Sequence, residues 1–395
     1  MTGNDYLRIW YRVQIGATLV ILAMMMIRNY EFNRQTVALA LLIMVIILGI
    51  GLVFELLPNV SLLVKKLNAW LQVIAQPIIL VFAWDVMVRE IIVLLHLPSR
   101  GVVTMMIFYY FIMFAPFASV IGEFMHWSIE RLIFIAWLAQ VVFTPLIALP
   151  TDLVDNHFLL LALSTGAVGA VAFFILTTTV MRTWHLSWPG LKPHWSGDFN
   201  WGIFAGLVVV DIIFMALNTG EMPRLHRANW DFTLSAFEAA VMEETLFRFA
   251  ILGILFYAWR NVKQRLPLAL ATSSILFGIV HLTNYGPQEW SRTVLQAVSA
   301  AGIGLFFATV YVYTGQLWLA MVMHFLLDWT AFIASDSTLM TGKVTVQNWI
   351  GTGIELVVFI GIAVWMMFGQ RRQVMERHVN RLTGEHQRFD FMIQY

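Results

Sequence analysis

The sequence predicts an all-α fold, a polytopic bundle of about twelve transmembrane helices. The 395 residues are 60% hydrophobic and only 12% charged, whereas soluble domains are about 25% charged. Many apolar runs approach the roughly 20 residues that a helix needs to cross a bilayer. The net charge of +1 gives no reason to expect a nucleic-acid partner. The absence of cysteine excludes disulfides, thiolate metal ligands and a cysteine nucleophile.

Each expected span is an apolar run that ends at a short polar or Pro/Gly break, such as FELLPN, LALPTD and YTGQL. In chain order the runs lie at 13–27, 37–57, 69–88, 102–121, 132–149, 158–180, 201–217, 233–257, 266–281, 294–313, 317–334 and 349–368. Lysines and arginines are somewhat more frequent on the side that carries both termini, which favours placing the termini in the cytoplasm.

The longest break divides the chain into regions. It covers 182–200, and its many Trp, Pro and Gly residues are typical of an interfacial linker. We therefore expect an N-terminal transmembrane region at 1–181 and a second module at 201–368, of which roughly five to six spans carry the function. The segment 369–395 is polar and basic, so we expect it outside the bilayer.

The stretch VMEETLFRFA, 241–250, places two acids and an arginine in an otherwise apolar run. A charge at the centre of a bilayer costs about 3 kcal/mol or more. Glu244 and Arg248 are one helical turn apart and can pair. Glu243 points about 100° away around the helix, so it is left free and suits proton transfer. The alternative is a structural ion pair with a neutral acid beside it.

Two later spans repeat this pattern. Phe277, His281 and Asn284 share a helix face, and so do His324 and Asp328. Each set alone could be interfacial packing or a polar pair that joins two helices. Together with the acids of the earlier span they could supply a base, an acid and hydrogen-bond donors that activate a water against a carbonyl, or they could hold a metal. His281 falls at the end of its run, so a common layer requires that helix to extend past 281.

These residues resemble the CPBP family of intramembrane glutamic endopeptidases, which includes type II CaaX prenyl proteases and bacteriocin-processing or abortive-infection proteins. The family pattern is E-E-x-x-x-R, then F-x-x-x-H, then H-x-x-x-N or D, on separate spans. The resemblance covers 233–335. The matching residues, in order, are Glu243, Glu244, Arg248, Phe277, His281, His324 and Asp328.

The resemblance implies a role for each polar residue. Glu243 and His281 would activate a water for peptide-bond hydrolysis, and His324 with Asp328 would stabilise the oxyanion. Glu244 and Arg248 would organise the site, supported by Phe277 and Asn284. No cofactor is required, although a divalent metal such as zinc on Glu243, His281, His324 and Asp328 is an alternative.

The last position departs from the eukaryotic enzymes, which have asparagine there. Asp328 can donate a hydrogen bond only as the neutral acid. Otherwise it orients His324, and His324 donates alone.

The expected partners follow from this reading. They are a peptide or membrane-protein substrate and the lipid bilayer, in the plasma membrane of a bacterium, where a bacteriocin leader or a peptide pheromone is an expected substrate. A non-catalytic immunity or scaffold protein and a proton-coupled transporter remain alternatives. Three further acids, Glu55, Asp85 and Asp211, are expected to join helices.

Overall fold

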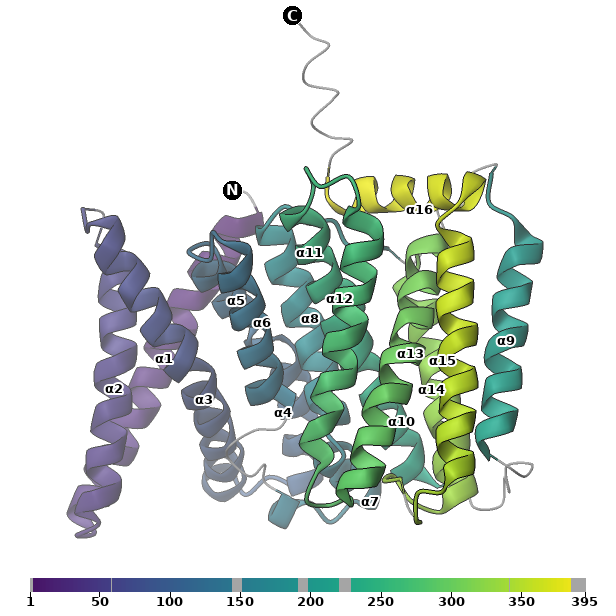
Figure 1. The fold of residues 1–395 in the computed structure, drawn as a ribbon. Coiled ribbons are helices and arrows are strands. Elements are labelled where there is room, and N and C mark those ends of the chain that lie inside the picture. The colour runs from purple at the N-terminus through teal and green to yellow at the C-terminus, as the bar shows by residue number, and fades with distance from the viewer. Residues whose placement is uncertain are drawn as a thin grey trace, which may run out of the picture. The chain divides into compact units, whose positions relative to one another are not determined.

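The computed structural model describes residues 3–57, 59–143, 151–190, 198–219, 229–340 and 342–384, and every regular element within these ranges is a helix (Figure 1). The predicted all-α polytopic class is therefore confirmed. The chain divides into two compact units, Met1–Trp184 and His185–Tyr395. The division follows Trp184, directly after the helix Ala167–Thr183, and so lies within segment 182–200. Residues 191–197 of that segment lie outside the described ranges.

The first unit is a set of apolar helices joined by short turns. Its elements are α1 (Gly3–Glu31), α2 (Gln35–Leu56), α3 (Leu62–Leu95), α4 (Ser99–Met113), α5 (Ala115–Gly122), α6 (Ser128–Phe143), η1 (Thr151–Leu153), α7 (His157–Ser164) and α8 (Ala167–Thr183).

Ion pairs hold the acids of this unit. Glu55 of α2 accepts a hydrogen bond from Arg12 of α1 at 2.9 Å. Arg89 of α3 pairs with Asp85 one turn earlier, at 3.0 Å, and with Asp152 of η1, at 2.7 Å. Glu55 and Asp85 thus take part in links between elements, as their position in apolar helices led us to expect.

The second unit contains all three sequence motifs. Its elements are α9 (Trp201–Thr219), α10 (Trp230–Glu244), η3 (Thr245–Ile251), α11 (Leu252–Ala258), α12 (Arg265–Val280), η4 (His281–Asn284), α13 (Trp290–Thr314), α14 (Leu317–Ser335), α15 (Val346–Met366) and α16 (Gly369–Leu382). In this unit α13 packs between α12 and α15, while α14 packs against α10 and α9 (Figure 1). The motif helices are therefore neighbours.

Local sequence signals set the ends of these helices. Asn229 caps α10 by accepting a hydrogen bond from the backbone N–H of Phe232 at 2.8 Å. Gly315 ends α13 with φ +66°, a conformation that costs glycine little. Thr345 and Asn348 form a reciprocal capping box at the start of α15.

Within the described residues, seven helices are long and apolar enough to cross a membrane, and the bent pair α7–α8 would make eight. This number is lower than the twelve expected runs for identifiable reasons. In the described chain, α6 and α9 are short and the 233–257 run is interrupted by η3. The 69–88 run lies in α3, a helix of 34 residues with Pro77 inside it, which is not among the seven. The ninth run extends through η4 to Asn284, past the end expected from the sequence.

The start of the basic C-terminal segment is a helix. In Figure 1, α16 crosses the ends of the second unit's other helices. It buries Val374, Met375 and Val379, and Arg381 donates to the carbonyl of Gly315 at 3.0 Å. The predicted polar tail therefore begins with an element that is docked on α13. Residues 385–395 lie outside the described ranges.

Candidate active site

The first motif lies where a helix changes its winding. Regular α-helix ends at Glu244, and Thr245–Ile251 continue as π-helix. Such turns are rare and occur frequently at functional sites. The Glu244 and Arg248 side chains are completely buried, whereas a quarter of the Glu243 side chain is exposed. The two neighbouring acids therefore occupy different environments, one inside the protein and one at an accessible surface.

The buried acid makes two contacts. Glu244 Oε2 lies 3.1 Å from Arg248 Nε, so the pair expected from the spacing is formed. Glu244 Oε1 lies 2.9 Å from His324 Nδ1. Because a carboxylate oxygen can only accept, Nδ1 is the donor in this contact. The other face of Arg248 covers the Phe277 ring, with 4.3 Å between guanidinium carbon and ring centroid.

His324 is the centre of the acid cluster. Its Nε2 atom lies 3.3 Å from Asp328 Oδ2 and 3.6 Å from Glu243 Oε2. Three carboxyl groups from two helices therefore surround one imidazole, which is itself buried. Glu244 fixes the ring orientation from behind, so the Nε2 edge is directed toward the two partly exposed acids.

His281 is oriented by its own helix. Its Nδ1 atom lies 2.8 Å from the carbonyl oxygen of Phe277. A carbonyl oxygen only accepts, so Nδ1 carries the proton and Nε2 keeps a lone pair in the neutral ring. The Phe277 ring packs edge-on against both imidazoles, with centroid distances of 4.8 Å to His281 and 6.1 Å to His324.

Small residues make this arrangement possible. A Cβ atom on Gly304 of α13 would come within 2.8 Å of the Phe277 ring, and one on Gly278 within 2.5 Å of the Ala297 carbonyl oxygen. These two glycines allow α12 to approach α13 closely enough to place Phe277 between Arg248 and the imidazoles.

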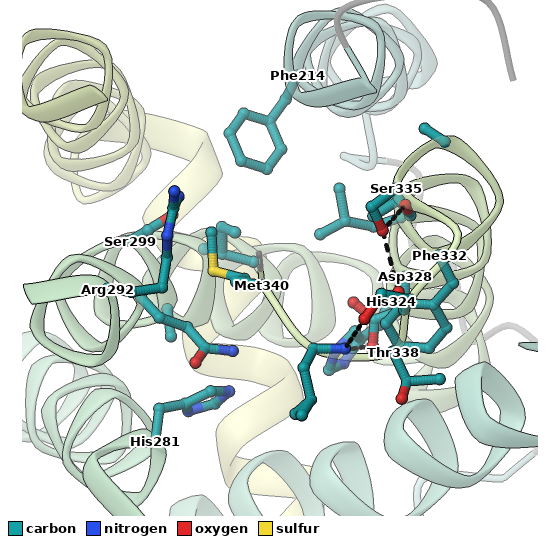
Figure 2. A pocket seen from close by; sticks show the side chains of 18 of the residues that line it. Phe214, His281, Arg292, Ser299, His324, Asp328, Phe332, Ser335, Thr338 and Met340 are labelled. Atoms are coloured by element: carbon teal, nitrogen blue, oxygen red, sulfur yellow. Dashed lines mark hydrogen bonds and ion pairs between the residues drawn. The ribbon is translucent and has the colours of Figure 1, made fainter. Parts of the chain in front are cut away.

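The three motifs meet beside a cavity of about 370 Å³. Figure 2 shows His281 on one side of this cavity, and His324 with Asp328 on the other. The cavity walls come from α9, α12, α13, α14 and the segment after α14, and they combine apolar side chains with these polar groups. Ligand sites are typically concave and mostly apolar with a few converging polar groups.

The structure therefore brings together Glu243, Glu244, Arg248, Phe277, His281, His324 and Asp328. Asn284 lies on η4, and its side chain donates to Gln296 at 3.0 Å and makes no hydrogen bond to His281. Its contribution is thus to hold a residue of α13.

Four functional candidates lie outside the sequence motifs; of these, only Asp211 is named from the sequence, as an acid expected to join helices. Glu238 lies one helical turn and a half before Glu243 and interacts electrostatically with it and with Asp328. Asp211 of α9 is buried and interacts with His324, and its Oδ1 atom has no hydrogen-bond partner among the described residues.

The other two candidates, Arg292 and Gln296, line the cavity from α13. They are one turn apart at the start of a span. Their spacing places them on one helix face, but arginine is ordinary at the start of a span, so the sequence carries no signal that marks them as a site.

A metal site was the alternative use of these side chains. In the described part of the chain, no group of three or more histidine, aspartate or glutamate side chains is arranged to hold a metal ion.

Fold and site define a class: a polytopic helical membrane protein with an acid–histidine cluster beside an internal cavity. Comparison with protein families makes this more specific. Residues 226–330 match the family described as type II CAAX prenyl endopeptidase Rce1-like, so this segment is similar to that protease family. The match includes the three motifs. No curated protein and no solved structure gave a match.

Proposed function

We propose that this protein is an intramembrane glutamic endopeptidase that hydrolyses a peptide bond in a membrane-associated peptide or protein. The observation that carries the proposal is that His281, His324 and Asp328 line the cavity while Glu243 lies 3.6 Å from His324 Nε2, all within the segment that matches a protease family. Each residue has a geometry suited to one step of the reaction.

Glu243 and His281 would activate the attacking water. Glu243 is within electrostatic range of both imidazoles, and the lone pair on His281 Nε2 can accept a hydrogen bond from a water that also contacts Glu243. The carboxylate takes the water proton as the oxygen attacks the carbonyl carbon. The same proton then passes to the amide nitrogen that leaves. Glu243 therefore ends the cycle in its starting state.

His324 and Asp328 would stabilise the oxyanion. The Nε2 edge of His324 is turned toward the cavity side by the bond from Nδ1 to Glu244. Asp328 Oδ2 can accept from Nε2–H while the neutral acid donates its own O–H to the oxyanion. Donors aimed at developing charge typically contribute about 3 kcal/mol each. The buried Glu244–Arg248 pair keeps the imidazole in place and touches no substrate.

This mechanism uses protein side chains alone and requires no metal. A bacteriocin leader or a peptide pheromone in a bacterial plasma membrane fits this substrate class. A non-catalytic scaffold or a proton-coupled transporter would use the same polar residues without turnover.

Substitution of Glu243 tests the proposal. Glu243→Gln keeps the shape of the side chain and removes the base, so an endopeptidase loses turnover while its fold is retained. Cells that express wild type or Glu243→Gln are compared by quantitative proteomics of their membranes. We expect at least one protein or peptide to accumulate uncut in the variant. Glu376→Gln, on the exposed pair of α16, is the matched control.

The alternatives give different outcomes. A scaffold protein would keep its phenotype and leave the membrane proteome unchanged in Glu243→Gln. A transporter would show flux into vesicles that depends on a proton gradient, with no new cleavage products. Either result would contradict the endopeptidase.

A further inference from the structure

The cavity has a second polar wall that the proposed mechanism does not use. It lies on the first turns of α13, on the same side of the cavity as His281, and faces His324 and Asp328. Arg292 and Gln296 line it, one helical turn apart. Figure 2 shows Arg292 on the side of the cavity opposite His324 and Asp328.

Neighbouring amides determine which end of Gln296 faces the cavity. Asn284 and Gln288 both donate their side-chain N–H groups to Gln296 Oε1, each at 3.0 Å. An amide nitrogen could not accept these bonds, so the oxygen of Gln296 must face its neighbours. Its NH₂ group has no partner among the described side chains and backbone atoms, and it is left to the cavity that Gln296 lines.

Arg292 is a buried cation without an acidic partner. It is 9% exposed, and its guanidinium donates one hydrogen bond, from Nη2 to the Gly342 carbonyl oxygen at 2.8 Å. Its Nε–H is buried and has no acceptor, and within the described ranges it forms no ion pair. Glu355 lines a second cavity that adjoins the first. Its carboxylate accepts a hydrogen bond from Ser299 at 2.9 Å and, in the part of the chain that the structure describes, forms no ion pair with Arg292. A buried charge with unused donors is costly unless a ligand completes it.

Arg292 also stands where two cavities meet. The second cavity, of about 590 Å³, has mostly apolar walls from α9, α13, α15 and the segment after α14. It shares Phe214, Arg292, Ser299 and Met340 with the first. A ligand that places an anionic group at Arg292 can therefore continue into an apolar space. The donors of this wall suit an acceptor-only group, and guanidinium is especially suited to carboxylate.

We propose that Arg292 and Gln296 form a subsite for a carboxylate of the substrate, either its C-terminus or an acidic side chain near the cleaved bond. The proposal rests on the proposed function, because it assigns the specificity of the same cavity. Arg292 would supply the charge, and the Gln296 amide would supply a second, uncharged donor. Bound carboxylate would hold the scissile bond between this wall and the side of the cavity that carries His324 and Asp328.

Binding of defined peptides tests the subsite. The full-length protein with Glu243→Gln, which cannot turn over, is titrated with three N-acetylated apolar hexapeptides. One has a free C-terminal carboxylate, one is amidated, and one is amidated with a single glutamate inside. The Kd of each is measured by intrinsic fluorescence. We expect one or both carboxylate peptides to bind roughly tenfold to hundredfold more tightly than the neutral peptide, as for hydrogen bonds to charged groups. Which of them does so identifies the source of the carboxylate.

Variants of the wall are compared in the same background. In Arg292→Gln the preference for carboxylate should vanish, while the neutral peptide binds as before; in Arg292→Lys part of it should remain. Gln296→Glu is nearly isosteric and still accepts from its neighbours, but it directs an oxygen into the cavity, so carboxylate peptides should bind more weakly. The exposed Arg260→Gln is the control. A purely structural role of Arg292 would weaken all three peptides equally.

The proposal is refuted if no carboxylate peptide binds more tightly than the neutral peptide, or if Arg292→Gln keeps the preference. Turnover by the protein with Glu243 intact is scored separately on the same peptides. A preference for carboxylate without hydrolysis would refute the endopeptidase but support the subsite. Hydrolysis without any preference for carboxylate would refute the subsite but support the endopeptidase.

Discussion

The buried pair of Glu244 and Arg248 gives the sharpest prediction about stability. Their side chains are 0% and 1% exposed and lie 3.1 Å apart. Removing one partner of a buried pair leaves a charge without compensation and typically costs about 3–5 kcal/mol. Arg248→Met should fall near the lower value of about 3 kcal/mol, because Glu244 keeps its contact with His324. Glu244→Gln should cost a similar amount, since it leaves the guanidinium buried and unpaired.

The double variant separates the pair from its surroundings. Glu244→Gln with Arg248→Met removes both charges, so its cost should be smaller than the sum of the two single costs. It should not reach wild-type stability, because the contact between Arg248 and the Phe277 ring is also lost, and such contacts are worth about 2 kcal/mol when desolvated.

The assay is unfolding of the purified protein in detergent micelles, followed by intrinsic fluorescence, for wild type, both single variants and the double variant. The pair Arg372 and Glu376 on α16 has the same helical spacing and a 2.8 Å separation, but it is 32% and 42% exposed. Arg372→Met should therefore cost about 1 kcal/mol or less. If Arg248→Met is no more destabilising than Arg372→Met, or if the two single costs simply add, the description of this site as a desolvated ion pair is wrong.

Four further predictions concern the site and the first unit. Asp328→Asn, which donates in any protonation state, should retain turnover, whereas Asp328→Leu should lose roughly 100-fold in kcat, as when an oxyanion donor is removed; equal loss in both would argue against donation. Because the proposed mechanism uses no metal, peptide cleavage should be the same before and after dialysis against a chelator. Loss of cleavage that zinc restores would refute that mechanism. Gly304→Ala should displace Phe277, since its Cβ would lie 2.8 Å from the ring. It should lower the free energy of unfolding by about 1–3 kcal/mol and abolish cleavage. Gly353→Ala, where the added Cβ meets open space, should do neither. Hydrogen bonds from Arg89 lower the pKa of Asp152, which lies between spans. The Tm of wild type should therefore exceed that of Asp152→Asn at neutral pH, and the difference should disappear as pH falls below about 3.9. A difference in Tm that persists in acid would contradict the pairing.

Some of the site could be predicted from the sequence because its contacts are local. Glu244 and Arg248 are paired by the rise and turn of one helix, and His324 and Asp328 are related in the same way. Other contacts join distant segments. The bond between Glu244 and His324 connects residues 80 positions apart, and neither the spacing within α10 nor that within α14 implies it.

The winding of η3 and the opposite wall of the cavity illustrate the same limit. Nothing in the sequence at 245–251 distinguishes π-helix from α-helix, because the apolar residues that follow the two acids are compatible with either winding. Arg292 is a charged residue at the start of a span, where arginine is ordinary. Its importance becomes visible only when its buried, unpartnered Nε and its place on the cavity wall are known.

The sequence by itself determined the membrane class, the helical nature of the apolar runs and the identity of the ionisable residues within them, because hydropathy and helical spacing act over one or two turns. Tertiary structure alone decided which of these residues meet. The close packing of α12 on α13 at Gly278 and Gly304 and of α10 on α14 places three carboxyl groups around His324 and sets the donors of Arg292 and Gln296 across the cavity. The physical reason is that such contacts depend on how whole helix surfaces fit together, which no single stretch of residues encodes.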